Sequence, residues 1–584
     1  MSSFGIAKIA KLLSFWSVLV NTLAVMAAVS AVVLDDVLPT VLIALIPLAI
    51  IGWRQRRALF RSPGRVGGIG RYLTARYLLL VTAVEQLHAI DQLGGPAIFA
   101  CVLLMIAAAL EPLLSALSKF AIPYAAHLSS DDRREGPAFP YGIAFPLGVA
   151  AVLVMVLASL APAPLGLLAL LLSAATVLVF VIALLDVARG IRSRLRFQER
   201  LPEVLEELAP VFYVYWHAPP KSAFQVTMWL PYLERLGVPF VLVTRTVPSF
   251  LQLRAATEHP VILRRSLTDL DDLIVPSARG VFYVNNAMRN NHMVRYSQLT
   301  HIQLLHGESD KAASATPIIR MYDRDFVAGQ AAIDRFDTFG VPMPPEIFRI
   351  VGRPQVEDVA EERGPIGELP ERTVLYAPTW LGYQEETNYS SLLSGPEIVR
   401  SLLERGCRIV FRPHPYSDRS PELREAGDTI REMLAADAEA TGREHLFGEL
   451  AEREMSVVDC FNACDAMISD VSAVVGDFLH SGKPLGMVSP RTGAEEFVEQ
   501  FPMARAAYVL VARDGELVGL DAMLDRLLEQ DPHREERRRW ATYYLGDIPR
   551  ENYAQRFVET ACEELGIPVP APLPSPAPAD LQEL

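Results

Sequence analysis

The feature that most constrains this chain is a series of long apolar segments within its first 190 residues. The runs lie at 14–34, 37–53, 96–114, 142–161 and 164–185. Each approaches the roughly 20 residues that an α-helix needs to cross the hydrocarbon core of a bilayer. A water-soluble core cannot bury so many such segments, so the sequence predicts an α-helical membrane domain over residues 1–195.

A weaker run at 72–92 decides the predicted topology. Lys and Arg collect on the cytoplasmic side of membrane proteins. Lys8, Lys11 and the Arg-rich segments 54–76 and 189–196 should therefore all lie inside. Only an even number of crossings satisfies this, so we predict about six transmembrane helices, with 72–92 as one of them. The chain would then be a multi-pass protein of the cell membrane with its larger part on the cytoplasmic face. An interfacial helix is the alternative interpretation of 72–92.

The charge of the chain divides with its hydropathy. The whole chain carries 54 Lys and Arg against 68 Asp and Glu, a net charge of −14. Residues 1–200 hold 17 basic and 10 acidic residues, a net of +7, which leaves −21 for residues 201–584. An acidic soluble half argues against a nucleic-acid partner. The 5 cysteines are sparse and lack metal-ligand spacing, so neither a disulfide framework nor a metal site is predicted.

From about residue 205 the pattern changes to short β-branched or aromatic runs that alternate with helical stretches. This alternation is typical of parallel α/β layers. A polar segment at 353–371, rich in Gly, Pro and charge, separates two such units. We therefore predict two doubly wound, Rossmann-like lobes at 205–355 and 370–548. A last helix and a Pro-rich tail would occupy 550–584.

Polar segments stand at the ends of predicted strands in both units. They are His306–Lys311, Pro378–Trp380, Arg412–Pro415 and Asp470–Ala473. Ligands of open α/β sheets bind beyond the carboxyl ends of the strands. The sequence therefore predicts that these segments line one cleft.

The segments differ in the chemistry they offer. Asp470 or Ser472 is placed to cap a helix whose free N–H groups can bind a phosphate, although most such caps bind nothing. Arg412 and His414 flank a proline, and both suit phosphate recognition; a surface ion pair and a packed histidine are the alternatives.

His306 precedes a glycine, and Lys311 follows five residues later. A general base beside a cation suits transfer to a hydroxyl, because the base takes the proton and the cation steadies phosphoryl oxygens. Alone, a His-Gly pair is weak evidence, and it gains weight from the other segments.

Taken in order, these motifs resemble the CDP-glycerol glycerophosphotransferase family, which contains primases and polymerases of teichoic-acid-type polymers. The matching residues are His306-Gly307 to Lys311, Tyr376 to Trp380, Arg412 to Pro415, and Asp470 through Asp477-Phe478 to Lys483-Pro484. The resemblance covers roughly 205–545. It implies a GT-B fold of two facing Rossmann-like lobes, with the donor held mainly by the second lobe and with no obligatory metal or other cofactor.

The resemblance also implies roles for individual residues. The implied catalytic residues are His306, which would deprotonate the acceptor hydroxyl, and His414, which with Arg412 would hold the donor pyrophosphate. The implied donor-binding residues are Lys311, Thr379, Arg412, Asp470 and Ser472. This sequence departs from the family pattern at Ala473, where a second serine is expected, and in the acidic residues of segment 308–310.

The expected function is a membrane-bound transferase that moves glycerol phosphate, or a similar alditol phosphate, from a CDP-activated donor to a hydroxyl of a lipid-linked or cell-envelope polymer acceptor. Its partners would be that donor, that acceptor and the lipid bilayer, with no nucleic acid. The alternatives are a GT-B glycosyltransferase that uses a nucleotide sugar, and a non-catalytic nucleotide-binding membrane sensor.

Overall fold

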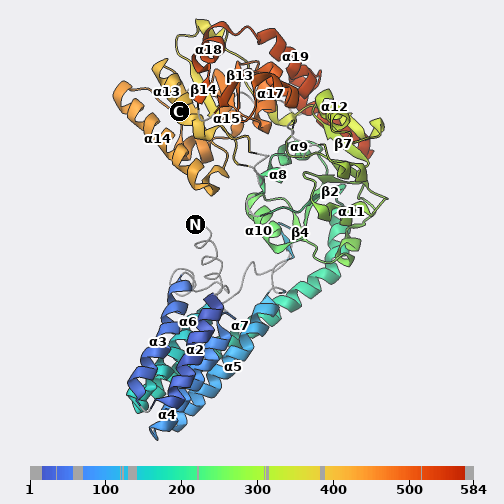
Figure 1. Cartoon of the computed structure of the whole chain (residues 1–584). Coiled ribbons are helices and arrows are strands. Elements are labelled where there is room, and N and C mark those ends of the chain that lie inside the picture. The colour runs from blue at the N-terminus through green and yellow to red at the C-terminus, as the bar shows by residue number, and fades with distance from the viewer. Residues whose placement is uncertain are drawn as a thin grey trace. The chain divides into compact units, whose positions relative to one another are not determined.

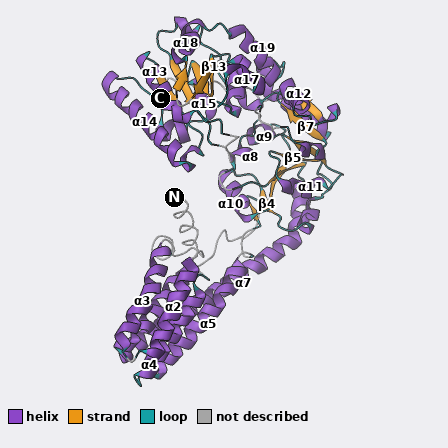
Figure 2. Ribbon diagram, viewed as in Figure 1, coloured by secondary structure: helices purple, strands orange, loops and turns teal. Residues whose placement is uncertain are grey.

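The computed structural model describes residues 16–34, 36–56, 70–118, 120, 124–128, 141–219, 222–307, 310, 315–381, 388–513 and 516–571. The chain forms two compact units, Met1–Val204 and Leu205–Leu584. The first unit is helical, and the second contains parallel β-sheets with helices around them (Figures 1 and 2).

The helices of the first unit pack side by side (Figure 1). They are α2 (Trp16–Val33), α3 (Val37–Arg54), α4 (Leu73–Ala89), α5 (Gly95–Ser118), α6 (Ala144–Leu157) and α7 (Pro162–Leu208). By length and composition, four of them can cross a membrane: α2, α3, α5 and α7. The helical stretch Ala144–Leu160 is apolar but shorter. The number of crossings and the side that faces the cytoplasm therefore remain predictions.

Small residues are frequent in the interior of this unit, where they pack with larger ones such as Leu79 and Phe180. Small side chains such as Ala24, Ala44 and Ala83 are fully buried, whereas large ones such as Leu42 and Leu178 are more than half exposed. Membrane helices pack in this way, because small residues let helices approach and lipid accommodates the large apolar ones.

One charged residue of the predicted cytoplasmic Arg-rich segment is buried instead. Arg76 of α4 forms an ion pair of 2.6 Å with Glu111 of α5, and both side chains are almost fully enclosed. A buried charge needs such a partner, so this pair ties α4 to α5.

The second unit begins with a parallel sheet in the order β4–β3–β2–β5–β6–β7–β8. The strands are β2 (Phe212–Trp216), β3 (Phe240–Thr244), β4 (Val261–Leu263), β5 (Gly280–Tyr283), β6 (Thr300–Gln303), β7 (Arg324–Val327) and β8 (Phe348–Ile350). The helices are α8 (Phe224–Thr227), α9 (Leu230–Glu234), α10 (Val247–Ala256), α11 (Asn291–Val294) and α12 (Gln330–Thr338). The strand order reverses between β2 and β5, which is the topological switch point of this lobe.

The second sheet has the order β10–β9–β11–β12–β13–β14, and its last strand is antiparallel. The strands are β9 (Thr373–Ala377), β10 (Arg408–Phe411), β11 (Ala466–Ser469), β12 (Leu485–Ser489), β13 (Tyr508–Arg513) and β14 (Glu516–Val518). The helices are α13 (Gly395–Glu404), α14 (Pro421–Thr441), α15 (Val457–Asn462), α16 (Ala473–Phe478), α17 (Ala494–Gln500), α18 (Leu520–Asp525) and α19 (Arg534–Leu545). Here the switch point lies between β9 and β11.

The last helix, α20 (Tyr553–Leu565), returns to the first lobe. Phe557 packs against Trp229 with ring centroids 5.3 Å apart, and Glu564 forms ion pairs of 2.8 Å with Arg324 and 2.7 Å with Arg349. Two doubly wound lobes joined in this way constitute a GT-B fold, so the predicted fold class of the soluble half is confirmed.

Candidate active site

His306 follows β6 at the carboxyl edge of the first sheet. Its Nδ1 lies 2.8 Å from the carbonyl oxygen of Val284. A carbonyl oxygen only accepts hydrogen bonds, so Nδ1 carries the ring proton. In the neutral imidazole, Nε2 is therefore unprotonated, and its lone pair can accept a proton or a hydrogen bond.

The orientation of Gln225, which lies beside His306 Nε2, is consistent with this tautomer. The Gln225 amide oxygen accepts hydrogen bonds from Trp216 Nε1 at 3.1 Å and Asn285 Nδ2 at 2.9 Å. The Gln225 amide nitrogen must then face the other way, and it lies 3.3 Å from His306 Nε2. Burial lowers the pKa of His306 below its ordinary value, and Arg353 lowers it further, against the effect of the Val284 bond. A neutral histidine with an accepting Nε2 has the form that a general base requires.

Gly307 brings the first lobe against the second. Its φ of +155° is a conformation that residues with side chains rarely adopt. A Cβ at this position would lie 3.2 Å from the Cβ of Ala473 and 4.0 Å from Arg353 Nη2. The His-Gly segment thus touches the first residue of α16, and the first and last of the predicted motifs lie side by side.

Arg353 lies at the start of the segment 353–371, which was predicted as a linker between the lobes and not as part of the site. Its guanidinium binds the carboxylate of Asp477 in α16, with Nε–Oδ1 and Nη2–Oδ2 distances of 2.9 and 3.4 Å. The side chain is 7% exposed. Arg353 therefore places a buried positive charge beside the His-Gly segment, and Asp477 of the fourth motif holds it there.

The acidic stretch after the His-Gly pair is partly explained by Asp310. Its carboxylate accepts hydrogen bonds from Tyr544 Oη at 2.9 and 2.8 Å and from Met503 N at 2.9 Å. Arg335 Nη2 lies 3.5 Å away and balances the charge. Asp310 therefore anchors the segment after His306 to the second lobe. Lys311 lies outside the described residues.

Asp470 has contacts that differ from the role that the resemblance implied. Its buried carboxylate accepts hydrogen bonds from Thr379 N at 2.9 and 3.0 Å, from Ser391 N at 2.9 Å and from Ser391 Oγ at 3.0 Å. These bonds join the ends of β9 and β11 at the switch point. The contacts are those of a positioning residue, because internal N–H and O–H groups already bind its oxygens. Ser472 is the N-cap of α16, and its side chain makes no capping hydrogen bond.

Arg412 and His414 point their polar groups to different partners. Arg412 Nη1 binds the carbonyl oxygens of Ala451 and Met455, the latter at 2.8 Å, so this nitrogen stabilises the 450–455 segment. His414 Nδ1 accepts a hydrogen bond from Tyr416 N at 3.1 Å. Its ring proton must then lie on Nε2, which makes His414 a hydrogen-bond donor.

Lys483 of the fourth motif lies before β12, at the amino edge of the second sheet. The side chain is buried, and its ammonium group donates to the carbonyl oxygen of Phe461 at 2.7 Å. Burial lowers the pKa of Lys483. Its place in the fold indicates a structural role, away from the carboxyl edge where the other motifs gather.

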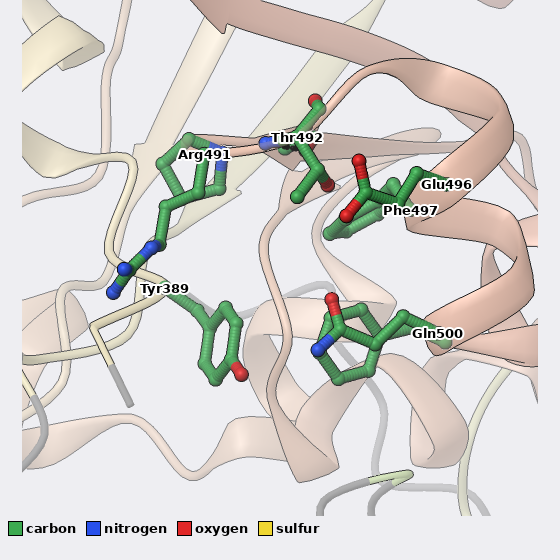
Figure 3. A pocket seen from close by; sticks show the side chains of 9 residues that line it. Tyr389, Arg491, Thr492, Glu496, Phe497 and Gln500 are labelled. Atoms are coloured by element: carbon green, nitrogen blue, oxygen red, sulfur yellow. Dashed lines mark hydrogen bonds between the residues drawn. The ribbon is translucent and has the colours of Figure 1, made fainter. Parts of the chain in front are cut away.

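A cavity of about 200 Å³ opens beyond the carboxyl end of β12. It is lined by Tyr389, Ser489, Pro490, Arg491, Thr492, Glu496, Phe497, Gln500 and Phe501. Figure 3 shows Glu496 and Gln500 on one side of the cavity and Tyr389 across from Gln500, while Arg491 extends away from Glu496 and Gln500. Among the residues that the structure describes, no group of His, Cys, Asp and Glu side chains is arranged to hold a metal ion.

Comparison with known proteins agrees with the family resemblance. Residues 354–491 match the family described as CDP-Glycerol:Poly(glycerophosphate) glycerophosphotransferase. No curated protein sequence matches the chain significantly.

Solved structures of low identity also match. The wall teichoic acid polymerase TagF has 13% identity and a TM-score of 0.41, over 65% of this chain and 96% of that chain. A UDP-N-acetylglucosamine 2-epimerase from Listeria monocytogenes has 15% identity and a TM-score of 0.39, over 61% and 97%. The matched family segment runs from the linker to the end of β12 and contains three of the four predicted motifs. Residues 354–491, most of the second lobe, are therefore similar to the CDP-glycerol:poly(glycerophosphate) glycerophosphotransferase family of transferases.

Proposed function

We propose that the chain transfers glycerol phosphate, or a similar alditol phosphate, from a CDP-activated donor to a hydroxyl group of a lipid-linked or envelope-polymer acceptor at a membrane. One observation carries the proposal. The two lobes supply histidines of opposite hydrogen-bonding character: His306 has an accepting Nε2, and His414 has a donating Nε2. Phosphoryl transfer to an alcohol needs a base for the hydroxyl and a donor for the charge on the phosphate.

In the proposed reaction the acceptor hydroxyl gives its proton to His306 Nε2, and the oxygen attacks the phosphorus that bears the glycerol. The bond from this phosphorus to the bridging oxygen breaks, and CMP leaves with that oxygen and its electron pair. His414 Nε2–H donates to the departing phosphate. Arg353, held by Asp477, adds positive charge as negative charge accumulates at phosphorus.

The proposed donor contacts come from the carboxyl edge of the second sheet. Thr379 and Ser472 would contact the donor, whereas Asp470 and Arg412 would act by positioning the loops around it. A role for Lys311 in donor binding remains a proposal from the sequence motif. The apolar helices of the first unit would hold the enzyme at the bilayer. Such anchoring raises the effective concentration of a lipid-linked acceptor.

A second candidate is transfer of a sugar from a nucleotide sugar. It is favoured by Glu496 and Gln500, which line the cavity beyond β12 (Figure 3). A carboxylate and an amide are groups that can bind sugar hydroxyls.

The test is nucleotide release by the purified full chain in lipid nanodiscs, with a lipid extract as the acceptor source. CDP-glycerol, CDP-ribitol and UDP-sugars are supplied in parallel. We expect CMP from a CDP-alditol, and a loss of about 10²- to 10⁴-fold in His306→Ala with donor binding retained. His259→Ala is the matched control, because His259 pairs with Glu234 away from the site. Release of UDP alone would favour the second candidate, and binding without release of any nucleotide would favour the sensor.

A further inference from the structure

The switch point of the first sheet is surrounded by basic side chains. His217 follows β2, Arg245 follows β3, and Arg289 and His292 lie in the segment after β5. In doubly wound sheets this position is where ligands bind. None of these residues belongs to the motifs that identified the family.

The backbone brings these side chains together. Trp216 and Thr244 are paired across β2 and β3, so His217 and Arg245 leave the sheet at the same level. Tyr215 Oη donates to the carbonyl oxygen of Arg289 at 3.0 Å. Electrostatic coupling agrees: the pKa of His217 is lowered by burial and then by Arg289, Arg245 and His292.

Several buried polar atoms of this cluster have no hydrogen-bond partner among the described residues. Arg245 is 4% exposed; its Nη2 donates to the carbonyl oxygen of Arg265 at 3.1 Å. Its Nε and Nη1 are buried and have no hydrogen-bond partner among the described residues. The same holds for Nδ1 of His217 and Nδ1 of His292. Buried groups left in this state cost free energy, which a bound ligand would recover.

Nearby acids do not neutralise the cluster. Asp272 pairs with Arg264, and Asp271 pairs with Arg295. The Tyr215 phenol lies close to Arg245, but burial raises its pKa to about 12, so it remains a neutral hydroxyl. Among the residues that the structure describes, the net charge at the switch point is positive, and the complementary ligand is an anion.

The cluster is joined to the proposed base by hydrogen bonds. Asn285 Nδ2 donates to the carbonyl oxygen of His217 at 3.2 Å and to Gln225 Oε1 at 2.9 Å. Gln225 in turn faces His306. An anion bound at the cluster would therefore lie in the same lobe as the base, beside the position of the acceptor hydroxyl.

We propose that His217, Arg245, Arg289 and His292 form an anion site in the first lobe that binds a phosphate group of the acceptor. This inference rests on the proposed function and locates the acceptor phosphate. The phosphate is either a phosphodiester of a growing chain or the diphosphate of a lipid carrier. Guanidinium groups suit both, because they bind phosphate oxygens through paired N–H donors.

The test measures binding to the full chain in nanodiscs with saturating CMP, which occupies the donor lobe. The probes are a fluorescent glycerol phosphate trimer, a triglycerol that lacks phosphate, and farnesyl diphosphate. The variants are Arg245→Gln, Arg245→Lys and Arg289→Gln. Arg320→Gln is the matched control, since Arg320 is an exposed arginine of the same lobe outside the cluster.

We expect Arg245→Gln and Arg289→Gln each to raise the Kd of at least one anionic probe by about tenfold or more. Arg320→Gln should leave that Kd unchanged. Preference for the trimer would indicate a growing chain, and preference for the diphosphate a lipid carrier. Equal binding by all variants, or binding of triglycerol as tight as that of the trimer, would overturn the proposal. If replacing the buried Arg245 prevents folding, probe binding by Arg289→Gln decides the test, because Arg289 is exposed.

Turnover is a separate readout. Absence of nucleotide release together with arginine-dependent probe binding would reject the proposed function but not the anion site. Release of CMP together with probe binding that does not depend on the arginines would support the proposed function and reject the anion site.

Discussion

The two lobes share a topology but use their switch points differently. In the second lobe, Asp470 at the end of β11 is bound by Thr379 and Ser391, so this edge is closed by internal hydrogen bonds. In the first lobe, two buried N–H groups of Arg245 and one ring nitrogen each of His217 and His292 have no hydrogen-bond partner among the described residues. The comparison teaches that a shared strand order fixes where polar residues gather, whereas the local partners decide whether those residues hold the protein or remain available to a ligand.

The two histidines repeat this contrast at the scale of one side chain. Each follows a strand, and each has Nδ1 fixed by the backbone. At His306 the partner is a carbonyl oxygen, whereas at His414 it is an N–H group. The same imidazole is therefore an acceptor in one lobe and a donor in the other.

Among the variants that distinguish the roles of the two histidines, those at His414 should change CMP release the most. His414→Ala should lower kcat/KM for the donor by about 10²-fold, because it removes one hydrogen-bond donor to developing charge. His414→Gln should recover part of the loss, since an amide N–H can donate. His306→Gln should recover none, because an amide cannot take a proton at neutral pH. Steady-state CMP release measures all three variants. Equal recovery at both positions would break the assignment of opposite roles.

Separating Arg353 from Asp477 should have the next largest effect. Arg353→Gln should lower kcat by about tenfold, because it removes a buried positive charge beside the reacting phosphate. Asp477→Asn should give a smaller loss, and the two changes should be coupled by about 0.5–3 kcal/mol in a double-mutant cycle. Strictly additive losses in CMP release would show that the ion pair does not act as a unit.

The pH dependence should sharpen the assignment of His306. The base works only when neutral, and its pKa lies below the ordinary value of about 6.5. The midpoint of the decline in activity at acidic pH should therefore lie below pH 6.5. Arg353→Gln should move this decline to higher pH, because loss of a nearby cation makes protonation of His306 easier. A profile of kcat/KM for both proteins measures the shift, and a decline that stays fixed would contradict the coupling.

Ala473→Ser should have the smallest effect. Ala473 opens α16 beside Gly307, and serine would add one hydroxyl at the point where the family has one. We expect the donor KM to fall by about threefold or less, because a hydrogen bond to the donor replaces one to water and so contributes little net free energy. Ala494→Ser, at the first position of α17, is the matched control and should leave KM unchanged. A rise in donor KM would indicate that the second hydroxyl does not fit this site.

Much of the fold could be predicted because its signals are local. Apolar runs of membrane-spanning length marked α2, α3, α5 and α7, and β-branched runs marked the strands of both sheets. The antiparallel β14 could not be predicted, because a three-residue edge strand carries almost no pattern of its own. The shared edge could be predicted for the same reason, because His306, Thr379, Arg412 and Asp470 each follow a parallel strand.

The sequence by itself determined the division of the chain into an apolar helical part and two α/β lobes, and which polar residues end the strands. Periodicity and residue type decide these features within short windows. Only the tertiary structure decided which ring nitrogen of His306 and His414 carries the proton, that Asp477 holds Arg353, and that Asp470 is bound internally. These properties depend on hydrogen bonds between residues up to 124 positions apart, which no local pattern records.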